Sequence, residues 1–407
     1  MMGQIHQMRR QKLAWLLPED AGALVFSGDE IPLGVDMTYP FCVDRNFYYL
    51  TGLDIPGAAV FISARGSKLF LPPFDAKREI YEGPQPSFRA MCETAGFSEE
   101  DALEGISEGS MLGHLPRLSS IWLDILRPEV PCYRSPASRM AARARNAGLE
   151  VQNVYKKIYA LRRVKDAEEI AKLRRAVDIV GESLDFMAET CCAGMPENQW
   201  QAAFEYAMRQ RGCEPSFPSI VAGGKNAVFL HYTKNNAPVN RGEMLLMDVG
   251  AYYDHYASDI SRTFPVGGFT KRQREIYELV YDVTRVNLEY MKPGNPYQAH
   301  VDAMCAYFAK YLKPLHIAET EIEQENFLRG LSRGVCHHMG LDAHDGYAAP
   351  DEILVPGMVF TNEPGVYLRE EGIGVRIEED LLITETGNEL LSRNIPSAAV
   401  DVEYYLK

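Results

Sequence analysis

The stretch of residues 244–263, MLLMDVGAYYDHYASDISRT, decides how the second half of this chain folds. An apolar run ends at Asp248, before Gly250, and a second run presents Asp259 eleven residues after that first carboxylate. This spacing predicts two adjacent antiparallel strands joined by a turn at residues 252–254, with both carboxylates on one face. Since like charges on neighbouring strands destabilise a sheet, the arrangement favours a cation between them.

Three further candidate ligands follow, each in a short apolar or glycine-flanked segment. His337 belongs to a cluster of three histidines within eight residues, Glu363 ends an apolar run before a Pro-Gly pair, and Glu378 lies in an alternating run. In that run Arg376 and Asp380 share the face of Glu378. Taken singly, each has an ordinary interpretation as a strand-end, core or surface residue, whereas all five in this order indicate one site.

Four carboxylates and one imidazole need a compensating charge, because the carboxylates would otherwise repel one another and take up protons. Two divalent cations would remove that repulsion and supply hydrolytic chemistry. The carboxylate-rich donor set favours Mn²⁺, with Co²⁺ and Zn²⁺ as alternatives. The sequence therefore predicts a dinuclear metal site formed by Asp248, Asp259, His337, Glu363 and Glu378.

The region around these residues predicts an α+β domain over residues 156–407. Two capping boxes, Asp166 with Glu169 and Thr270 with Gln273, each begin a run with helical spacing of apolar residues. Strands are expected at residues 219–222, 244–249, 359–362, 374–377 and 381–384. Helices followed by antiparallel strands are typical of an α+β catalytic domain.

The first 155 residues predict a smaller α/β domain. Residues 1–17 have the pattern of an amphipathic helix, and residues 23–26 form a short apolar run that ends at Ser-Gly. Residues 58–62 and 68–71 are expected as neighbouring strands across a glycine-containing turn. A proline-bearing stretch at residues 128–136 precedes the last helix of this domain.

Bulk properties narrow the class of partner. The chain has 407 residues, and its net charge of −14 argues against nucleic acid or an anionic membrane as the main partner. Eight scattered cysteines lack a paired CxxC zinc pattern, and no signal peptide or membrane span is expected. These features predict a cytoplasmic protein with reduced thiols.

The chain resembles the pita-bread metallopeptidases, and within them the Xaa-Pro aminopeptidases (aminopeptidase P) and the prolidases. The matching stretches are LHYTKNNAPVNRGEMLLMDVGAYYDHYASDISRTFPV (230–266), GVCHHMGLDAHD (334–345), FTNEPGVYL (360–368), GVRIEEDLLITETGNELL (374–391), LRRVKDAEEIAKLRRAVDI (161–179) and DRNFYYLTGL (44–53). The resemblance covers essentially the whole chain. It implies a creatinase-type α/β N-terminal domain followed by a pita-bread catalytic domain.

The resemblance also implies roles for individual residues. Asp248 would bind the first metal, Asp259 and Glu378 would bridge both metals, and His337 and Glu363 would complete the second. Outside the ligand set, the implied catalytic or substrate-binding residues are His231, His344, Arg376 and Tyr367, and Glu363 would also carry a proton. Such enzymes are commonly dimers or tetramers, so a homodimer or homotetramer is expected.

The implied activity is removal of an N-terminal residue that precedes proline, with an Xaa-Pro dipeptidase (prolidase) and a non-catalytic binding protein as alternatives. The chain departs from the family at Arg333, where active members usually carry histidine, and at Phe217, where a tyrosine is common. Arg333 would also contact substrate, because its cation on the leaving-group side would favour a substrate carboxylate and therefore short peptides.

Overall fold

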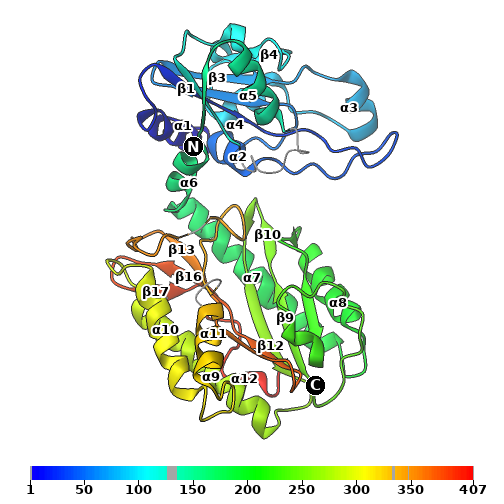
Figure 1. Ribbon diagram of the computed structural model, residues 1–407. Coiled ribbons are helices and arrows are strands. Elements are labelled where there is room, and N and C mark those ends of the chain that lie inside the picture. The colour runs from blue at the N-terminus through cyan, green and yellow to red at the C-terminus, as the bar shows by residue number, and fades with distance from the viewer. Residues whose placement is uncertain (1, 126–134, 332–334, 347, 407) are drawn as a thin grey trace. The chain divides into compact units, whose positions relative to one another are not determined.

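The computed structural model describes residues 2–125, 135–331, 335–346 and 348–406 (Figure 1). The chain separates into two compact units, Met1–Arg162 and Arg163–Lys407. The division follows helix α6 (Tyr155–Arg162), so it falls after residue 162 rather than after the expected residue 155. Helix α6 belongs to the first unit because it contacts α1 (Met2–Trp15) and α2 (Arg45–Thr51).

A six-stranded sheet in the order β4-β3-β2-β1-β5-β6 forms the centre of the first unit. Strand β2 runs antiparallel to both β1 and β3, and its pairing with β3 was expected from the sequence. Strands β1, β5 and β6 are parallel neighbours. The strands are β1 (Ala21–Phe26), β2 (Ala59–Ser63), β3 (Gly66–Leu71), β4 (Ala102–Glu104), β5 (Ser120–Leu123) and β6 (Glu150–Asn153). The other helices are α3 (Ala76–Glu82), α4 (Phe88–Ala95), α5 (Pro136–Asn146), η1 (Glu99–Asp101) and η2 (Met111–His114).

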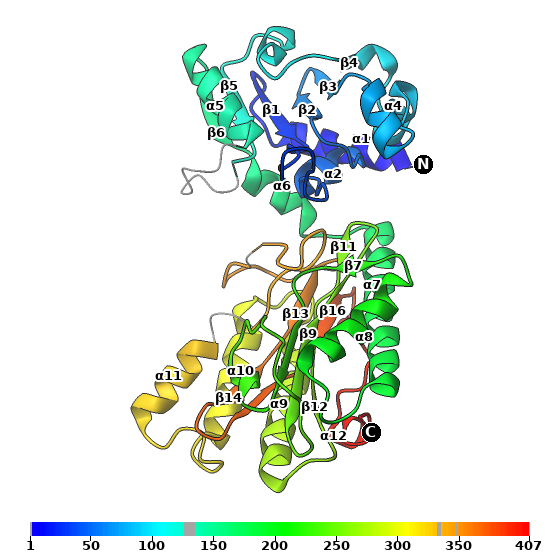
Figure 2. The same cartoon turned by 90° about the vertical axis from the view of Figure 1, so that its right-hand side faces the viewer.

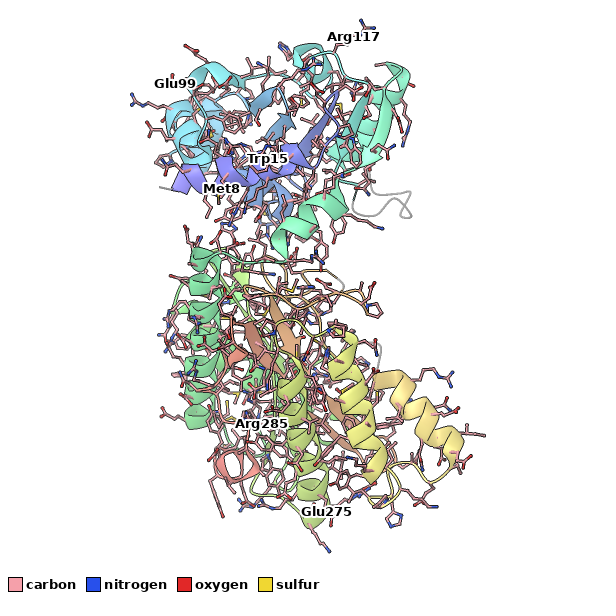
Figure 3. All side chains as sticks on the ribbon, turned by 90° about the vertical axis from the view of Figure 1, so that its left-hand side faces the viewer. Met8, Trp15, Glu99, Arg117, Glu275 and Arg285 are labelled. Carbon is pink, nitrogen blue, oxygen red and sulfur yellow. The ribbon has the colours of Figure 1, made fainter. Side chains whose placement is uncertain are left out.

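Two helices of this unit show how local signals decide structure. In α1 the apolar Trp15 is 81% exposed (Figure 3), whereas the charged Arg9 and Arg10 are buried beside Leu13, so the helix lacks the predicted amphipathic pattern. Arg10 is buried because its guanidinium donates to the carbonyl oxygens of Leu50 and Ala95. The apolar run at residues 47–50 could equally form a strand, but it lies in helix α2. The side chain of Asp44 accepts a hydrogen bond from the backbone N–H of Phe47, and Gly52 ends the helix with a φ of 69°.

Antiparallel strands fill the centre of the second unit, and every strand pair among its described residues is antiparallel. Two three-stranded sheets, β12-β9-β8 and β13-β16-β17, lie beside the ribbon β14-β15 and the small sheet β11-β10-β7. The strands are β7 (Glu214–Pro215), β8 (Ile220–Gly223), β9 (Met244–Val249), β10 (Ala251–Tyr253), β11 (Tyr256–Ala257), β12 (Ile260–Pro265), β13 (Val359–Asn362), β14 (Gly365–Leu368), β15 (Ile373–Arg376), β16 (Glu379–Ile383) and β17 (Asn388–Leu390).

Helices cover the strands of this unit on two sides. Figure 2 shows α7 (Ala167–Thr190) and α8 (Glu197–Arg209) on one side, and α9 (Lys271–Tyr290) with α10 (Gln298–Tyr311) on the other. Both predicted capping boxes are present, at the beginnings of α7 and α9. The remaining helices are α11 (Glu321–Leu331), α12 (Ala399–Val402) and η3 (Gly224–Val228). The α+β prediction for this half is confirmed.

The predicted pairing of β9 with β12 is confirmed, and its register places Asp248 opposite Ser261. The connection differs from the expected simple turn at residues 252–254. The chain forms an additional hairpin, β10–β11, in which Tyr253 pairs with Tyr256. Asp254 and His255 make its turn, with φ values of 44° and 70°. These positive φ values suit a tight two-residue hairpin turn, and Asp and His tolerate them better than most residues.

Candidate metal centre

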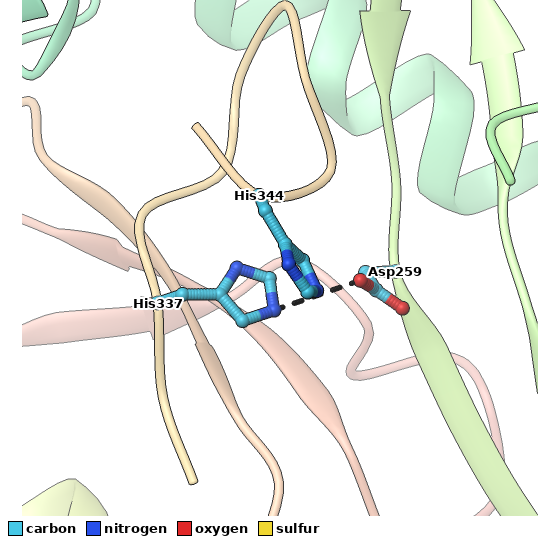
Figure 4. A group of neighbouring side chains, drawn as sticks. All are labelled: Asp259, His337 and His344. Carbon is cyan, nitrogen blue, oxygen red and sulfur yellow. Dashed lines mark ion pairs between the residues drawn. The ribbon is translucent and has the colours of Figure 1, made fainter. Parts of the chain in front are cut away.

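The five predicted ligands lie together in the second unit, although they come from separate segments of the chain. Three overlapping groups have ligand atoms within 4.8 Å of one another: Asp248, Asp259 and Glu378; His337, Glu363 and Glu378; and Asp259, His337 and His344. Figure 4 shows the last of these groups, with the ring of His337 facing the carboxylate of Asp259. The structure therefore brings together all five residues that the sequence placed at strand ends.

Asp248 lies at the end of the buried strand β9, and Asp259 is the residue that precedes strand β12. The chain passes so tightly after Asp248 that a Cβ atom on Gly250 would lie 2.0 Å from the carbonyl oxygen of Ser258. The carboxylate atom Oδ1 of Asp248 is buried, and no hydrogen-bond donor among the described residues reaches it. A buried carboxylate oxygen without a donor needs a partner, and a metal ion would supply it.

His337 presents one ring nitrogen to the carboxylates. Its Nδ1 lies 3.1 Å from the carbonyl oxygen of His338, which fixes the proton there and leaves Nε2 as a donor of electrons. Nε2 lies 3.7 Å from Oδ2 of Asp259 and 3.3 Å from Oε1 of Glu363. Burial, together with the neighbouring His344, lowers the pKa of His337 to about 3, so the ring is neutral at pH 7. A neutral imidazole with a fixed tautomer is the form that binds metal.

Glu363 and Glu378 are each fixed by a hydroxyl group. The hydroxyl of Thr361 donates to Glu363 over 3.3 Å, and the hydroxyl of Ser261 donates to Glu378 over 2.7 Å. Burial raises the pKa of Glu363 to about 7, and the charge of Asp248 contributes. Burial and the neighbouring carboxylates also raise the pKa values of Glu378 and Asp259 well above their ordinary values. These carboxylates therefore repel one another unless a cation joins them.

Arg376 borders the carboxylate cluster. Its guanidinium donates to Oδ2 of Asp248, to the hydroxyl of Tyr367 over 2.9 Å and to the hydroxyl of Ser261 over 2.7 Å. A single cation held at this edge leaves most of the negative charge uncompensated. The charge, the neutral Nε2 atom and the unpaired Oδ1 atom of Asp248 all fit divalent cations.

The residues expected to contact substrate lie around this cluster. His344 is solvent-exposed, and its ring centroid lies 4.2 Å from that of His337. Partial loss of solvent around the ring lowers the pKa of His344, and the nearby His231 lowers it further. Phe217 packs near Gly250, two residues after Asp248. Arg333 lies outside the described residues, so its expected contact with substrate stays a prediction.

Two residues outside the predicted ligand and substrate-binding sets support the site. The backbone N–H of Asp259 donates to Oδ2 of the buried Asp380 over 3.2 Å. Arg262 is fully buried and donates to the carbonyl oxygen of Glu378 and to the carboxylate of Glu379. Arginine inside an apolar strand is a detectable signal, because such a side chain is buried only with a partner. Its partner could not be assigned without the fold.

A cluster of buried carboxylates and one neutral histidine, gathered at strand ends of an antiparallel unit, defines a metal-dependent hydrolase. The family model for metallopeptidase family M24 matches residues 171–385, and the family model for the aminopeptidase P N-terminal domain matches residues 6–109. The chain belongs to metallopeptidase family M24 and has the pita-bread fold with an aminopeptidase P N-terminal domain. It is accordingly a metallopeptidase that binds divalent metal.

Individual relatives agree with this assignment. An Xaa-Pro aminopeptidase from Haemophilus influenzae is 32% identical, with 98% of this chain and 96% of that protein covered. A putative aminopeptidase P from Bacillus anthracis has a TM-score of 0.91 at 30% identity, covering 100% of this chain and 98% of the other. A zinc-substituted Escherichia coli aminopeptidase P in complex with product has a TM-score of 0.87 at 29% identity, with the same coverage. Among the described residues, none of the helices has the length and apolar character needed to cross a bilayer.

Proposed function

We propose that this protein is an Xaa-Pro aminopeptidase that uses two divalent cations to remove an N-terminal residue preceding proline. The observation that carries the proposal is the convergence of Asp248, Asp259, His337, Glu363 and Glu378, with ligand atoms in groups no wider than 4.8 Å. The relatives that cover nearly the whole chain are Xaa-Pro aminopeptidases, which supports the substrate class. Asp259 and Glu378 would bridge the two cations, since both share a group with Asp248 and each also belongs to a group that contains His337.

Two cations bound here would supply Lewis acidity toward a carbonyl oxygen and a hydroxide nucleophile at neutral pH. Glu363 would take the proton of the attacking water and return it to the leaving nitrogen of proline. Its position suits this task, because the hydroxyl of Thr361 holds one carboxylate oxygen over 3.3 Å, beside the unprotonated Nε2 atom of His337. A carboxylate within hydrogen-bond reach of the attacking water acts as a general base and can then return the proton as a general acid.

His344 would donate a hydrogen bond to the carbonyl oxygen as negative charge develops on it. The ring lies beside His337 and is exposed, so a substrate reaches it without displacing the fold. His231 would orient the substrate on its proline side, because it lies near enough to His344 to influence the pKa of that ring. These roles require neither His344 nor His231 to transfer a proton through the protein interior.

Arg376 and Tyr367 would hold the substrate-facing edge of the site. Arg376 fixes Asp248 directly and Glu378 through Ser261, while its third contact orients the hydroxyl of Tyr367. That hydroxyl would then face the bound peptide. The acidic cluster would also attract the free N-terminal ammonium of the substrate, which favours an aminopeptidase over an endopeptidase.

A bond that precedes proline is a tertiary amide without an N–H group. An enzyme for this bond has to recognise the ring and the N-terminus instead of the missing donor. Manganese is the proposed native metal, because carboxylate oxygens dominate the donor set, with Co²⁺ and Zn²⁺ as alternatives. Calorimetric titration of the chelated protein with each metal would rank them.

A peptide panel tests the activity. Mn²⁺-loaded protein should hydrolyse an Xaa-Pro-Xaa tripeptide, spare the matched Xaa-Ala-Xaa peptide, and lose activity on chelation. Asp259→Asn should abolish both turnover and binding of the second equivalent of metal. Faster cleavage of Gly-Pro than of the tripeptide would make the protein a prolidase, and Arg333→His would test whether Arg333 causes that preference. Absence of turnover on every Xaa-Pro peptide in Mn²⁺ would favour a binding protein.

We also propose a cytoplasmic homodimer or homotetramer. The cytoplasmic location rests on the scattered cysteines, which remain free thiols in the part of the chain that the structure describes. An exposed apolar segment in the first unit supports self-association, because monomers seldom expose so many large apolar side chains together. These side chains belong to Ile31, Leu33, Val35, Met37 and Tyr39. Light scattering coupled to gel filtration would give the number of subunits.

A further inference from the structure

The carboxylate of Glu197 is fully buried at the first residue of α8, outside the metal centre. It accepts four hydrogen bonds from the segment 223–237. Oε1 accepts from the backbone N–H of Gly223 over 2.8 Å and from the amide of Asn226 over 2.9 Å. Oε2 accepts from the hydroxyl of Tyr232 over 2.8 Å and from the backbone N–H of Ala237 over 2.9 Å.

These four donors stand at both ends and in the middle of the segment that carries His231. The backbone closes the same loop, because the N–H of Glu197 donates to the carbonyl oxygen of Ala237 over 2.8 Å. Gly223 begins the loop at the end of β8, and Ala237 ends it. One carboxylate therefore fastens the start, the centre and the end of a loop of about fifteen residues, which would otherwise carry the entropy of a flexible connection.

His231 itself is exposed, and the residues before it, Phe229 and Leu230, are 53% and 54% exposed. Its position is therefore set by the backbone of the loop rather than by burial of its own side chain. The loop also packs closely against strand β15, since a Cβ atom on Gly374 would lie 2.0 Å from the carbonyl oxygen of Ala227. Strand β15, which contains Gly374, ends at Arg376.

A fully buried carboxylate is stable only when its charge is met. Here four N–H and O–H donors and the N-terminal end of α8, where the helix dipole is positive, meet the charge of Glu197. The carboxylate of Glu197 therefore accepts four charge-assisted hydrogen bonds, each stronger than a hydrogen bond between neutral groups.

We infer that Glu197 is a positioning residue for His231, acting by fixing the loop 223–237 against the substrate side of the metal centre. This inference rests on the proposed function of His231. Glu197 touches neither the substrate nor the metal ligands, so its effect on catalysis has to pass through the loop.

Glu197→Gln tests the inference without changing the shape of the side chain. The two backbone donors, from Gly223 and Ala237, lie on different carboxylate oxygens. Whichever way the amide turns, one backbone N–H therefore faces an NH₂ group and loses its acceptor. Glu182→Gln is the control, because Glu182 lies on the neighbouring helix α7 and accepts hydrogen bonds from Arg175 and Arg211, outside the loop.

Three measurements on the Mn²⁺-loaded full chain give the expected pattern. Glu197→Gln lowers kcat/KM for an Xaa-Pro-Xaa peptide about 10- to 100-fold, the scale of a misplaced substrate contact. In the His231→Ala background the same substitution lowers it less than about 3-fold, because the two residues act through one route. In the metal-free Glu197→Gln protein, amide hydrogens of the loop exchange about 10-fold faster. Glu182→Gln changes none of these quantities, and the Mn²⁺ affinity stays constant in both variants.

The outcomes separate this inference from the proposed function. If wild-type protein turns over the peptide and His231→Ala impairs it while Glu197→Gln does not, only the inference is overturned. Equal losses in the two backgrounds also overturn it, because they show general destabilisation. If His231→Ala has no effect, the role proposed for His231 is wrong and the inference fails with it. Should Glu197→Gln not fold, Tyr232→Phe removes one of the four bonds, and a smaller loss that again disappears with His231→Ala is then the expected result.

Discussion

The ion pair between Lys165 and Asp345 offers the clearest test of how the second unit holds its histidine loop. Nζ of Lys165 lies 3.3 Å from Oδ2 of Asp345, and the two side chains are only 1% and 2% exposed. Asp345 directly follows His344, and its backbone N–H donates to the carbonyl oxygen of His338 over 2.8 Å. The pair thus ties the segment before α7 to the loop that carries His337 and His344.

Lys165→Met removes the charge and keeps most of the side-chain volume. Removing one partner of a buried pair leaves an uncompensated charge, which costs about 3–5 kcal/mol of unfolding free energy. The control is Arg174→Met, because the pair of Arg174 with Glu389 is closer, at 2.6 Å, and bidentate, but its side chains are 40% and 25% exposed. Solvent screening limits that exposed pair to about 0–1 kcal/mol.

Urea unfolding of the metal-free proteins at pH 7 measures both costs. Trp200 is fully buried in the second unit, so a background with Trp15 and Trp122 replaced by phenylalanine makes its fluorescence a reporter of that unit alone. Adding Asp345→Asn to Lys165→Met should recover most of the loss, because both charges are then gone. A Lys165→Met cost no larger than that of Arg174→Met would refute the reasoning, and so would simple additivity in the double variant.

Three more outcomes follow from the same unit. Gly340→Ala should strongly destabilise the protein in thermal unfolding, because its Cβ would lie 2.2 Å from Oδ2 of Asp345, whereas Gly387→Ala, with no atom within 4 Å, should not. His300 is buried, and burial lowers its pKa to about 4, below the ordinary value of 6.5. Protonation of this residue therefore costs no unfolding free energy above pH 6.5, and the cost grows as the pH drops toward 4. His300→Leu should remove a loss of about 2 kcal/mol at pH 5, measured by urea unfolding at pH 5 and 7.5. Chelation should lower the melting temperature, and Mn²⁺ at 100 times its Kd should restore about 2.7 kcal/mol; an unchanged melting temperature would contradict the proposed metal site.

The sequence predicted the features that depend on local patterns. The capping boxes at Asp166 and Thr270 gave the beginnings of α7 and α9, and the apolar run before Asp248 gave strand β9. The run at residues 47–50 could not be assigned from its apolar character, because helix α2 depends on its two caps. The hairpin β10–β11 was missed, since a short segment between two strands has no pattern that separates a turn from a second hairpin.

The metal ligands and their supporting residues differ in how far a sequence can reveal them, and the reason is chemical. A ligand must be a carboxylate or an imidazole, so Asp248 and His337 stand out wherever they interrupt apolar segments. A positioning residue only has to offer an acceptor or a charge at the right point, and many residue types do so. Glu197 meets Ala237 40 positions away, and Lys165 meets Asp345 at a greater separation still. Because these contacts exist only in the folded chain, their roles have to be measured as coupling energies between pairs of substitutions rather than inferred from residue type.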